Sequence, residues 1–139
     1  MNNFGSTSLQ RLRTCHPDLI LIAYELSKEI DIAVLDGART KEKQNEAFKN
    51  GKSKLQYPKS KHNIGKEAGR EFSDAIDLAP FPIDWNNIAR FEDMCKRIEA
   101  IAKRLNIKIR LGRDFSFKDY PHIERIPWEK GLRRLYKVY

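Results

Sequence analysis

Asp74-Ala75-Ile76-Asp77-Leu78-Ala79-Pro80 is the stretch of this sequence that decides the fold. The apolar residues on both sides of Asp77 indicate a buried β-strand over residues 75–79. A carboxylate inside a buried strand is costly unless a partner neutralises it. Asp74 lies at the edge of the strand, where we expect water to solvate it, and positions three apart in a strand face opposite ways. We therefore expect Asp77, rather than Asp74, to bind a metal ion.

Two histidines complete a possible metal site around this strand. His62 stands in Ser60-Lys61-His62, and His122 stands in Asp119-Tyr120-Pro121-His122-Ile123-Glu124. Two imidazoles and one carboxylate can bind zinc and leave its fourth position to water, which is typical of a catalytic zinc. Asp119 would then be placed to act as a general base. As residue types alone, the three ligands also fit ordinary structural roles, because the chain has no short metal motif such as His-Glu-x-x-His.

Two further residues could belong to the site or to the scaffold. Arg39 follows the expected turn at Gly37-Ala38, and beside zinc its guanidinium could bind a substrate carboxylate or stabilise an oxyanion. Elsewhere on the surface it would be an ordinary solvated charge. His16 precedes Pro17 at an expected helix start, and we expect it to be structural.

The hydrophobic pattern predicts an α+β domain in which helices pack on a small sheet. Residues 51–74 are rich in Lys, Ser, Gly and Glu, which favours a long exposed loop. The expected helices cover 17–30, 40–50 and 84–106, the last capped by Asp84 and ended by Asn106. The expected strands cover 33–35, 75–79, 107–111 and 122–124.

Composition favours one domain and an anionic partner. The 139 residues predict a single domain over 1–139, with a core at 8–125 and a basic tail at 126–139. Lys and Arg total 27 against 19 Asp and Glu, a net charge of +8 that suits nucleic acid, a membrane surface or an anionic cell-wall polymer. We expect no membrane insertion and no secretory signal, hence synthesis in the cytoplasm. Cys15 and Cys95 are too few for a disulfide framework, and we expect both to be reduced.

Several motifs in fixed order resemble one family of enzymes. Ser60-x-His62-x-x-Gly65 followed by Ala75-x-Asp77 is similar to the Ser-x-His-x-x-Gly-x-Ala-x-Asp signature of zinc D-Ala-D-Ala carboxypeptidases and L-alanyl-D-glutamate endopeptidases. Asp119-x-x-His122 is similar to the second signature of this VanY-like and phage-endolysin group, an acid-x-x-His pair. Gly37-x-Arg39-Thr40-x-x-x-Gln44 is similar to its Gly-x-Arg-Ser/Thr-x-x-x-Gln segment. The resemblance covers residues 8–125.

The resemblance implies a site, a fold and a reaction. His62, Asp77 and His122 would bind Zn²⁺, Asp119 would be the general base, and Arg39 would contact the substrate or the oxyanion. Gln44 and Ser60 would shape the site and bind substrate. The implied fold carries zinc on a small antiparallel sheet, as in D-Ala-D-Ala peptidases and Hedgehog-like proteins. The implied reaction is hydrolysis of a stem peptide in bacterial peptidoglycan by a monomeric phage lysis enzyme, which reaches the cell wall after a holin permeabilises the membrane.

The chain departs from the family pattern between the first two ligands. The segment from His62 to Asp77 is longer than in the signature, and the extra residues fall within 66–74. Loop closure costs little for added length, so the ligands can still meet. Leu111-Gly112-Arg113-Asp114 also differs from the family's usual aromatic and Gly-Gly-Asp segment, which puts substrate specificity in doubt.

Three other activities stay open at this point. A D-Ala-D-Ala carboxypeptidase would share the site, and a wall-binding module without catalysis would share the fold. A nucleic-acid-binding protein would use the tail Arg133-Arg134-Leu135-Tyr136-Lys137, but no helix-turn-helix or base-stacking motif accompanies it. We expect the endopeptidase and no nucleic-acid partner.

Overall fold

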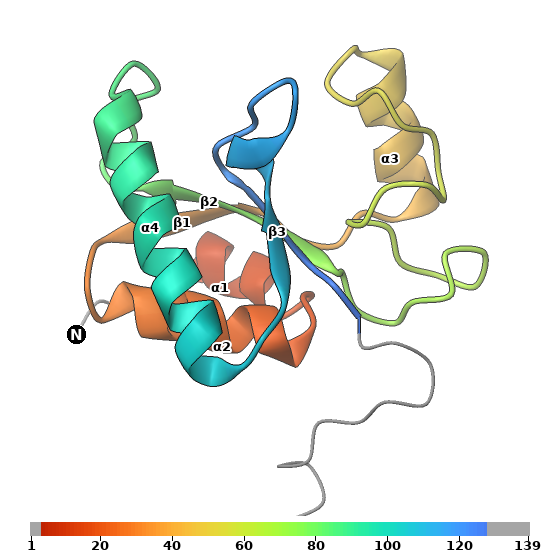
Figure 1. Ribbon diagram of the computed structural model, residues 1–139. Coiled ribbons are helices and arrows are strands. Elements are labelled where there is room, and N and C mark those ends of the chain that lie inside the picture. The colour runs from red at the N-terminus through yellow and green to blue at the C-terminus, as the bar shows by residue number, and fades with distance from the viewer. Residues whose placement is uncertain (1–3, 128–139) are drawn as a thin grey trace, which may run out of the picture.

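The computed structural model describes residues 4–127 and shows a mixed α+β fold (Figure 1). These residues contain four helices, one short 3₁₀ turn and four strands. In order they are α1 (Ser6–Leu12), α2 (Pro17–Ser27), β1 (Ile32–Asp36), α3 (Lys41–Lys49), β2 (Ala75–Pro80), α4 (Ile88–Leu105), β3 (Ile109–Leu111), η1 (Gly112–Asp114) and β4 (His122–Arg125).

The four strands form one antiparallel sheet in the order β1-β2-β4-β3. In the register between β2 and β4, Asp77 lies directly opposite His122. Between β1 and β2 the register shifts near Asp36, which also pairs with Asp77. Opposite residues in an antiparallel pair project from the same face at about 5 Å. The sheet register therefore brings two of the expected ligands together.

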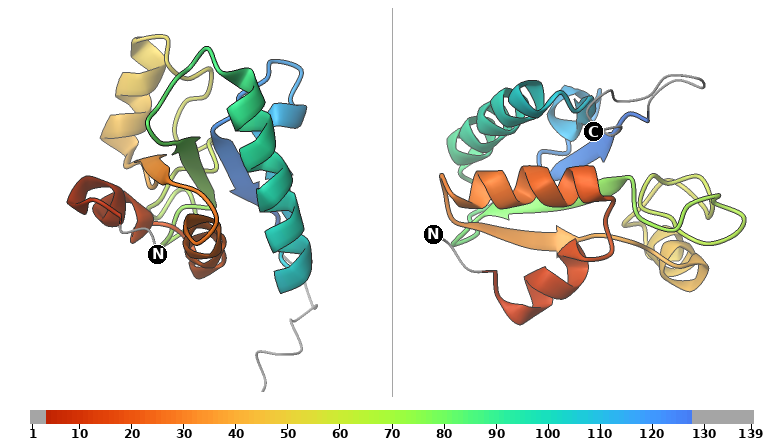
Figure 2. Two further views of the ribbon diagram at one scale, coloured as in Figure 1. Left: turned by 90° about the vertical axis from the view of Figure 1, so that its left-hand side faces the viewer. Right: turned by 90° about the horizontal axis from the view of Figure 1, so that it is seen from below.

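Helices α2 and α4 pack against each other and against the sheet, whereas α1 contacts β1 (Figure 2). The apolar stripe of α4 explains its position, because all of its buried residues lie at helical spacing. α3 stands apart from the other helices, beyond the end of β1 (Figure 1). The fully buried side chains form a continuous core between the sheet and α2 and α4, with Leu19, Ile22, Leu26, Ile76, Leu78, Met94, Ile98, Ile101 and Ile123 at its centre.

Most expected elements are present, with two differences. α1 was not expected from the sequence; its short run of residues has only Leu12 buried. α4 begins at Ile88, and its N-cap is Asn87, whose side chain accepts a hydrogen bond from the Arg90 backbone. The expectation that Asp84 caps this helix is wrong, because the Asp84 carboxylate accepts from the Asn86 backbone in the preceding turn. Asn106 ends α4 in the left-handed conformation, as expected.

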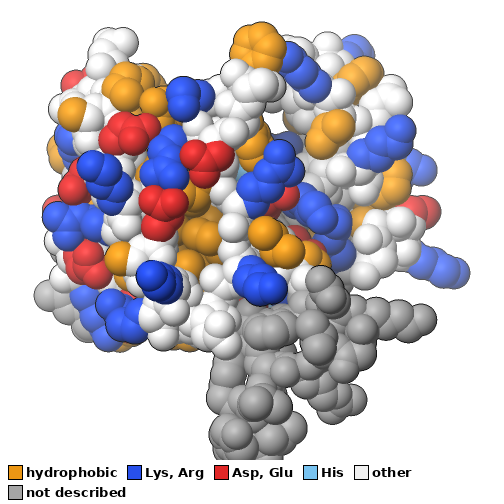
Figure 3. Space-filling view, in the orientation of Figure 1, with side chains coloured by type: hydrophobic (Ala, Val, Ile, Leu, Met, Phe, Trp, Pro, Cys, Tyr) orange, Lys and Arg blue, Asp and Glu red, His pale blue; other side chains and the backbone are white. Residues whose placement is uncertain are grey.

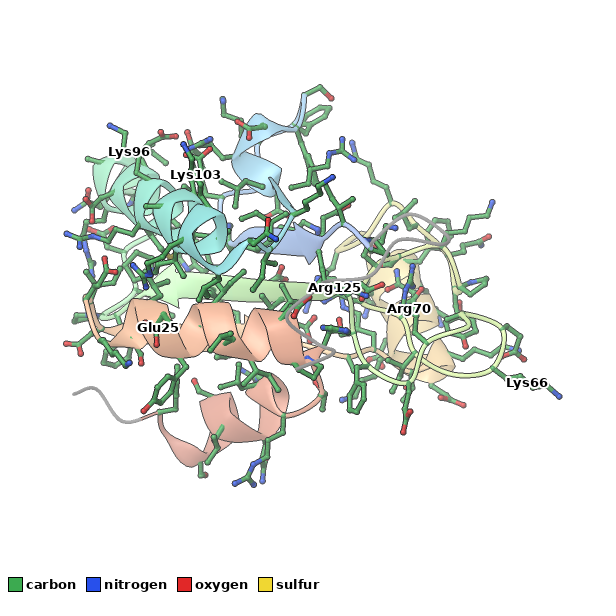
Figure 4. All side chains as sticks on the ribbon, turned by 60° about the horizontal axis from the view of Figure 1, so that its bottom comes forward. Glu25, Lys66, Arg70, Lys96, Lys103 and Arg125 are labelled. Carbon is green, nitrogen blue, oxygen red and sulfur yellow. The ribbon has the colours of Figure 1, made fainter. Side chains whose placement is uncertain are left out.

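The long segment between α3 and β2 contains neither helix nor strand, as the composition predicted. Its last part, however, is anchored to the fold. Asp74 is buried and accepts hydrogen bonds from Arg70 at 3.0 Å and Arg125 at 3.1 Å. The expectation that water solvates Asp74 is therefore wrong, since two guanidinium groups neutralise it. Figure 4 shows Arg70 and Arg125 close together between this segment and β4, while Lys66 projects away from the fold.

The structure also bears on membrane insertion and on the state of the two cysteines. No helix within residues 4–127 has the length and apolar character needed to cross a bilayer. Cys15 and Cys95 are free and buried. Burial raises the pKa of Cys15 to about 12 and that of Cys95 to about 11, so neither thiol is reactive at neutral pH. The basic tail lies mostly beyond the described residues.

Candidate metal centre and catalytic cleft

His62, Asp77 and His122 come together at one point on the sheet. One ligand atom from each lies within 4.8 Å of the other two. Asp77 and His122 arrive there through the register of β2 and β4. His62 arrives from the loop, where backbone hydrogen bonds join Arg39 to His62 (2.8 Å) and Ile64 to Arg39 (3.2 Å). The loop is thus fixed to the segment after β1, and the residues present can hold a metal ion.

The ring of His62 is held in one tautomer. Its Nδ1 lies 2.7 Å from the carbonyl oxygen of Gly37, which can only accept, so Nδ1 carries the proton. The other nitrogen, Nε2, is buried without a hydrogen-bond partner and lies 3.3 Å from Oδ1 of Asp77. A buried lone pair beside a carboxylate fits a metal ligand well, because a cation would satisfy both atoms.

His122 is oriented by a carboxylate that the sequence reasoning missed. Its Nε2 lies 2.8 Å from Oε1 of Glu124, and its Nδ1 lies 3.2 Å from Oδ1 of Asp77. Glu124 is two positions further along β4 and therefore on the same face. That alternation was the available signal in the sequence. The arrangement leaves Nδ1 facing the ligand group and gives Nε2 a partner, as in many carboxylate–histidine–metal sites.

The charges in this group depend on one another. Burial alone would raise the pKa of Asp77, but the hydrogen bond from His122 and the interaction with His62 hold it below its ordinary value. Burial alone would lower the pKa of His122, yet its hydrogen bonds to Asp77 and Glu124 raise it to about 9. Asp77 therefore stabilises positive charge next to it. It is suited to bind a metal ion in place of the proton on His122.

Arg39 lines the cleft beside the ligand group and is held from two sides. Its Nε donates to Oδ2 of Asp36 at 2.7 Å, and its Nη1 donates to Oε1 of Gln44 at 3.2 Å. Its Nη2 lies 4.0 Å from Oδ2 of Asp77. Two hydrogen bonds fix the guanidinium plane, so its free N–H groups are preorganised toward the cleft.

Gln44 and Ser60 support the site from behind and do not line the cleft. Gln44 is fully buried; besides Arg39, its Oε1 accepts from Asn63 at 2.9 Å, and its Nε2 donates to Leu55 at 2.6 Å. Ser60 is also buried, and its Oγ accepts from the His62 backbone at 3.2 Å. Gln44 thus holds the side chain of Arg39, and Ser60 holds the backbone of His62.

Asp119 lies at the mouth of the cleft in the turn between η1 and β4. Its backbone N–H donates to Gly112 at 2.9 Å, and its carbonyl accepts from the His122 N–H at 3.1 Å. A Cβ on Gly112 would overlap the Asp119 carbonyl and lie 2.9 Å from Cβ of His122, so this close approach needs glycine. The surrounding protein and then the negative charge of Asp77 raise the pKa of Asp119, as suits a general base.

Arg39, Asp77 and Asp119 line a cleft of about 450 Å³. Four other exposed residues of its lining were not expected at the site from the sequence: Lys52, Trp85, Ile88 and Lys118. Their spacing gives no signal, because they come from three separate loops and from the start of α4. A larger hollow of about 720 Å³ lies beside Phe81 and Arg90 and contains none of the ligands, so we place the site in the smaller cleft.

Two histidines and an aspartate grouped at an antiparallel sheet, with a further carboxylate lining the adjoining cleft, are typical of a metal-dependent hydrolase. The comparison with known families agrees. The model of the phage L-alanyl-D-glutamate peptidase family matches residues 1–127, and the chain belongs to this family.

Two relatives show how far the similarity extends. The L-alanyl-D-glutamate peptidase of Escherichia phage T5 is 37% identical over 128 residues, covering 87% of this chain and 87% of that protein. The crystal structure of the Serratia marcescens L-Ala D-Glu endopeptidase ChiX matches with a TM-score of 0.72 over 88% of this chain and 89% of that chain. At 22% identity the second match shows the shared fold. The α+β fold and the family resemblance expected from the motifs are thus confirmed.

Proposed function

We propose that this protein is a zinc-dependent endopeptidase that cleaves the bond between L-alanine and D-glutamate in the stem peptides of bacterial peptidoglycan. Family membership and the phage relative of that name support the substrate and the bond. The single observation that carries the metal is the buried Nε2 of His62, which has no hydrogen-bond partner and faces Asp77 and His122.

In this proposal His62, Asp77 and His122 hold the zinc ion. When bound, zinc would polarise the scissile carbonyl and lower the pKa of a water molecule in its open position. The geometry that orients the ligands belongs to the protein: Gly37 fixes His62, and Glu124 fixes His122.

Asp119 would move the proton, and Arg39 would stabilise the charge. The Asp119 carboxylate accepts a proton from the attacking water and later gives it to the leaving amine of D-glutamate, as the carbon–nitrogen bond breaks. The guanidinium of Arg39 stabilises the developing oxyanion or binds a substrate carboxylate. Gln44 and Ser60 contribute indirectly, through the residues that they hold in place.

Family membership supports a proposal about the biological setting. We infer that the enzyme acts during host-cell lysis as a monomer, on the cell wall, after a holin-type lesion gives it access. Its net charge of +8 favours contact with anionic wall polymers.

Digestion of purified peptidoglycan tests this function. The protein is incubated with zinc or with a chelator, and released ends are identified by mass spectrometry. We expect new N-terminal D-glutamate with zinc and none with the chelator. Release of free D-alanine would instead show a D-Ala-D-Ala carboxypeptidase. Binding to the wall without any cleavage would show a non-catalytic module.

A further inference from the structure

Trp85 forms an exposed aromatic surface at one end of the cleft. The side chain lies on Phe91, with ring centroids 5.6 Å apart and planes 15° from parallel. Phe91 is buried in the core, whereas Trp85 is 58% exposed. One face of the indole is therefore supported, and the other is open to solvent. An exposed indole with one face supported offers its other face to a flat ligand.

The backbone around Trp85 is held in place. The Asn87 N–H donates to the Asp84 carbonyl at 3.1 Å, and Arg90 donates to the Pro82 carbonyl at 2.6 Å. Asn87 also caps α4 immediately afterwards. The indole is thus presented by an ordered turn, so a ligand that stacks on it loses little free energy to ordering.

The two ends of the cleft differ in chemistry. Trp85, Ile88 and Phe91 form an uncharged end at the start of α4, where Figure 3 shows hydrophobic side chains gathered. Arg39 and Lys52, which flank α3, line the cleft as cations, as does Lys118 from the turn before β4. In Figure 1 the start of α4 and α3 lie on opposite sides of the sheet's upper edge. Asp77 and Asp119 line the same cleft.

The proposed substrate also has an uncharged part and a charged part. L-alanine joins the stem peptide to the lactyl group of N-acetylmuramic acid, whose sugar is uncharged once that amide is formed. D-glutamate and the residues after it carry carboxylates. A single residue spans at most about 3.5 Å, so the sugar lies close to the scissile bond.

We propose that Trp85 is a sugar-binding platform that stacks on the N-acetylmuramic acid ring, while Arg39 and Lys52 face the acidic part of the stem peptide. This proposal rests on the proposed function and adds the glycan to its substrate. It also sets the direction of binding, with the sugar at the α4 end of the cleft and the peptide toward α3. The enzyme would then bind both the sugar and the stem peptide of a muropeptide.

Two substrates that differ only in the acyl group on L-alanine test the platform. One is N-acetylmuramoyl-L-Ala-D-Glu extended by the next stem residues, and the other is the same peptide with an acetyl group in place of the whole N-acetylmuramoyl group. We expect Trp85→Ala to lower kcat/KM for the muramoyl peptide about fivefold, the size of one aromatic stacking contact, mainly through KM. The acetyl peptide should be cleaved by this variant and by the wild type at rates within about twofold.

Two variants serve as controls. Trp85→Tyr keeps a flat ring and should recover most of the loss. Phe81→Ala removes an aromatic side chain of similar exposure, 55%, from the same connection, but Phe81 lines the other hollow. It should cleave both substrates like the wild type.

The outcomes separate the two proposals. Equal loss on both substrates would show that Trp85 contacts the peptide or only supports the fold, and no loss on either would show that it has no role; both results overturn the platform. A wild-type enzyme that cleaves neither substrate would instead overturn the proposed function. Binding gives a second readout: N-acetylmuramoyl-L-alanine should change the fluorescence of Trp85 in a Trp128→Phe background, and an unchanged spectrum at saturating product contradicts the platform.

Discussion

His62 and His122 offer different ring nitrogens to the same point, and each choice is fixed by the other nitrogen's partner. The Gly37 carbonyl accepts a hydrogen bond from Nδ1–H of His62, which leaves Nε2 for a metal. Glu124 accepts a hydrogen bond from Nε2–H of His122, which leaves Nδ1. Orientation by such partners usually matters for affinity almost as much as the ligands themselves.

Glu124 offers a direct test of this orientation. We expect Glu124→Ala to weaken zinc binding about 10- to 100-fold, because His122 loses the acceptor that fixes its ring. Glu124→Gln keeps an oxygen acceptor at the same place and should lose less. Calorimetric zinc titration measures both. Unchanged affinity in Glu124→Ala would show that the turn and the sheet alone orient His122.

Asp119 and His122 lie in one turn but have separate roles in the proposed site. We expect Asp119→Asn to lower kcat by about 10²- to 10⁴-fold, since the proton acceptor is lost, with zinc content unchanged. His122→Ala should lose zinc itself. Activity on peptidoglycan and bound zinc by elemental analysis distinguish them. Loss of zinc in Asp119→Asn would mean that Asp119 is a ligand and not the base.

At the scale of elements, the hydrophobic pattern predicted the main parts of the fold. The stripe of α4 has a clear helical period, β1 and β2 are short apolar runs, and the positions of all three were correct to within a few residues. α1 has only one buried residue and was missed for that reason. The cap of α4 was misplaced because Asp84 and Asn87 are both good capping residues, and only the path of the chain decides between them.

The sequence predicted the ligand group of the site but not the contacts that support it. Sequence order identified the residues that lie together as a ligand group, because their motifs are local. The supporting contacts join distant segments, so spacing could not reveal them: Asp74 binds Arg125, and Gln44 binds Asn63. The cleft wall at Trp85 was invisible for the same reason.

The segment at 66–74 supports the proposed metal site from outside the ligand group. Arg70 donates to the carbonyls of Ser60 at 3.2 Å and Asn63 at 3.4 Å, on either side of His62, and also to Asp74. Asp74 in turn binds Arg125 at the end of β4. The extra residues thus clamp the loop that carries the first ligand to the strand that carries the third.

Removal of this clamp should loosen His62. We expect Arg70→Ala to lower the free energy of unfolding by about 1–3 kcal/mol, the usual loss for hydrogen bonds to a charged group, and to weaken zinc binding. Lys66→Ala is the matched control, because Lys66 is in the same segment and exposed. Urea unfolding and zinc titration measure both variants. Equal behaviour of the two would show that the segment only closes the loop.

At the scale of the whole molecule, the ligand group joins parts of the chain that are distant in sequence. His62 comes from the long loop, Asp77 from the centre of the sheet and His122 from the start of β4. A cation bound by all three would therefore stabilise the native state as a whole. The unfolded chain has few competing ligands, since it contains three histidines and two cysteines.

Zinc should accordingly raise the melting temperature in a way that depends on its concentration. At a free zinc concentration about 1,000 times Kd the native state gains about 4 kcal/mol. For a chain of this size that corresponds to a rise of roughly 10–15 °C, measurable by differential scanning calorimetry. Magnesium should have little effect, because it prefers oxygen ligands in octahedral geometry. His122→Ala should lose most of the rise, since two ligands bind zinc weakly; the same rise in this variant would place the stabilising ion elsewhere on the protein.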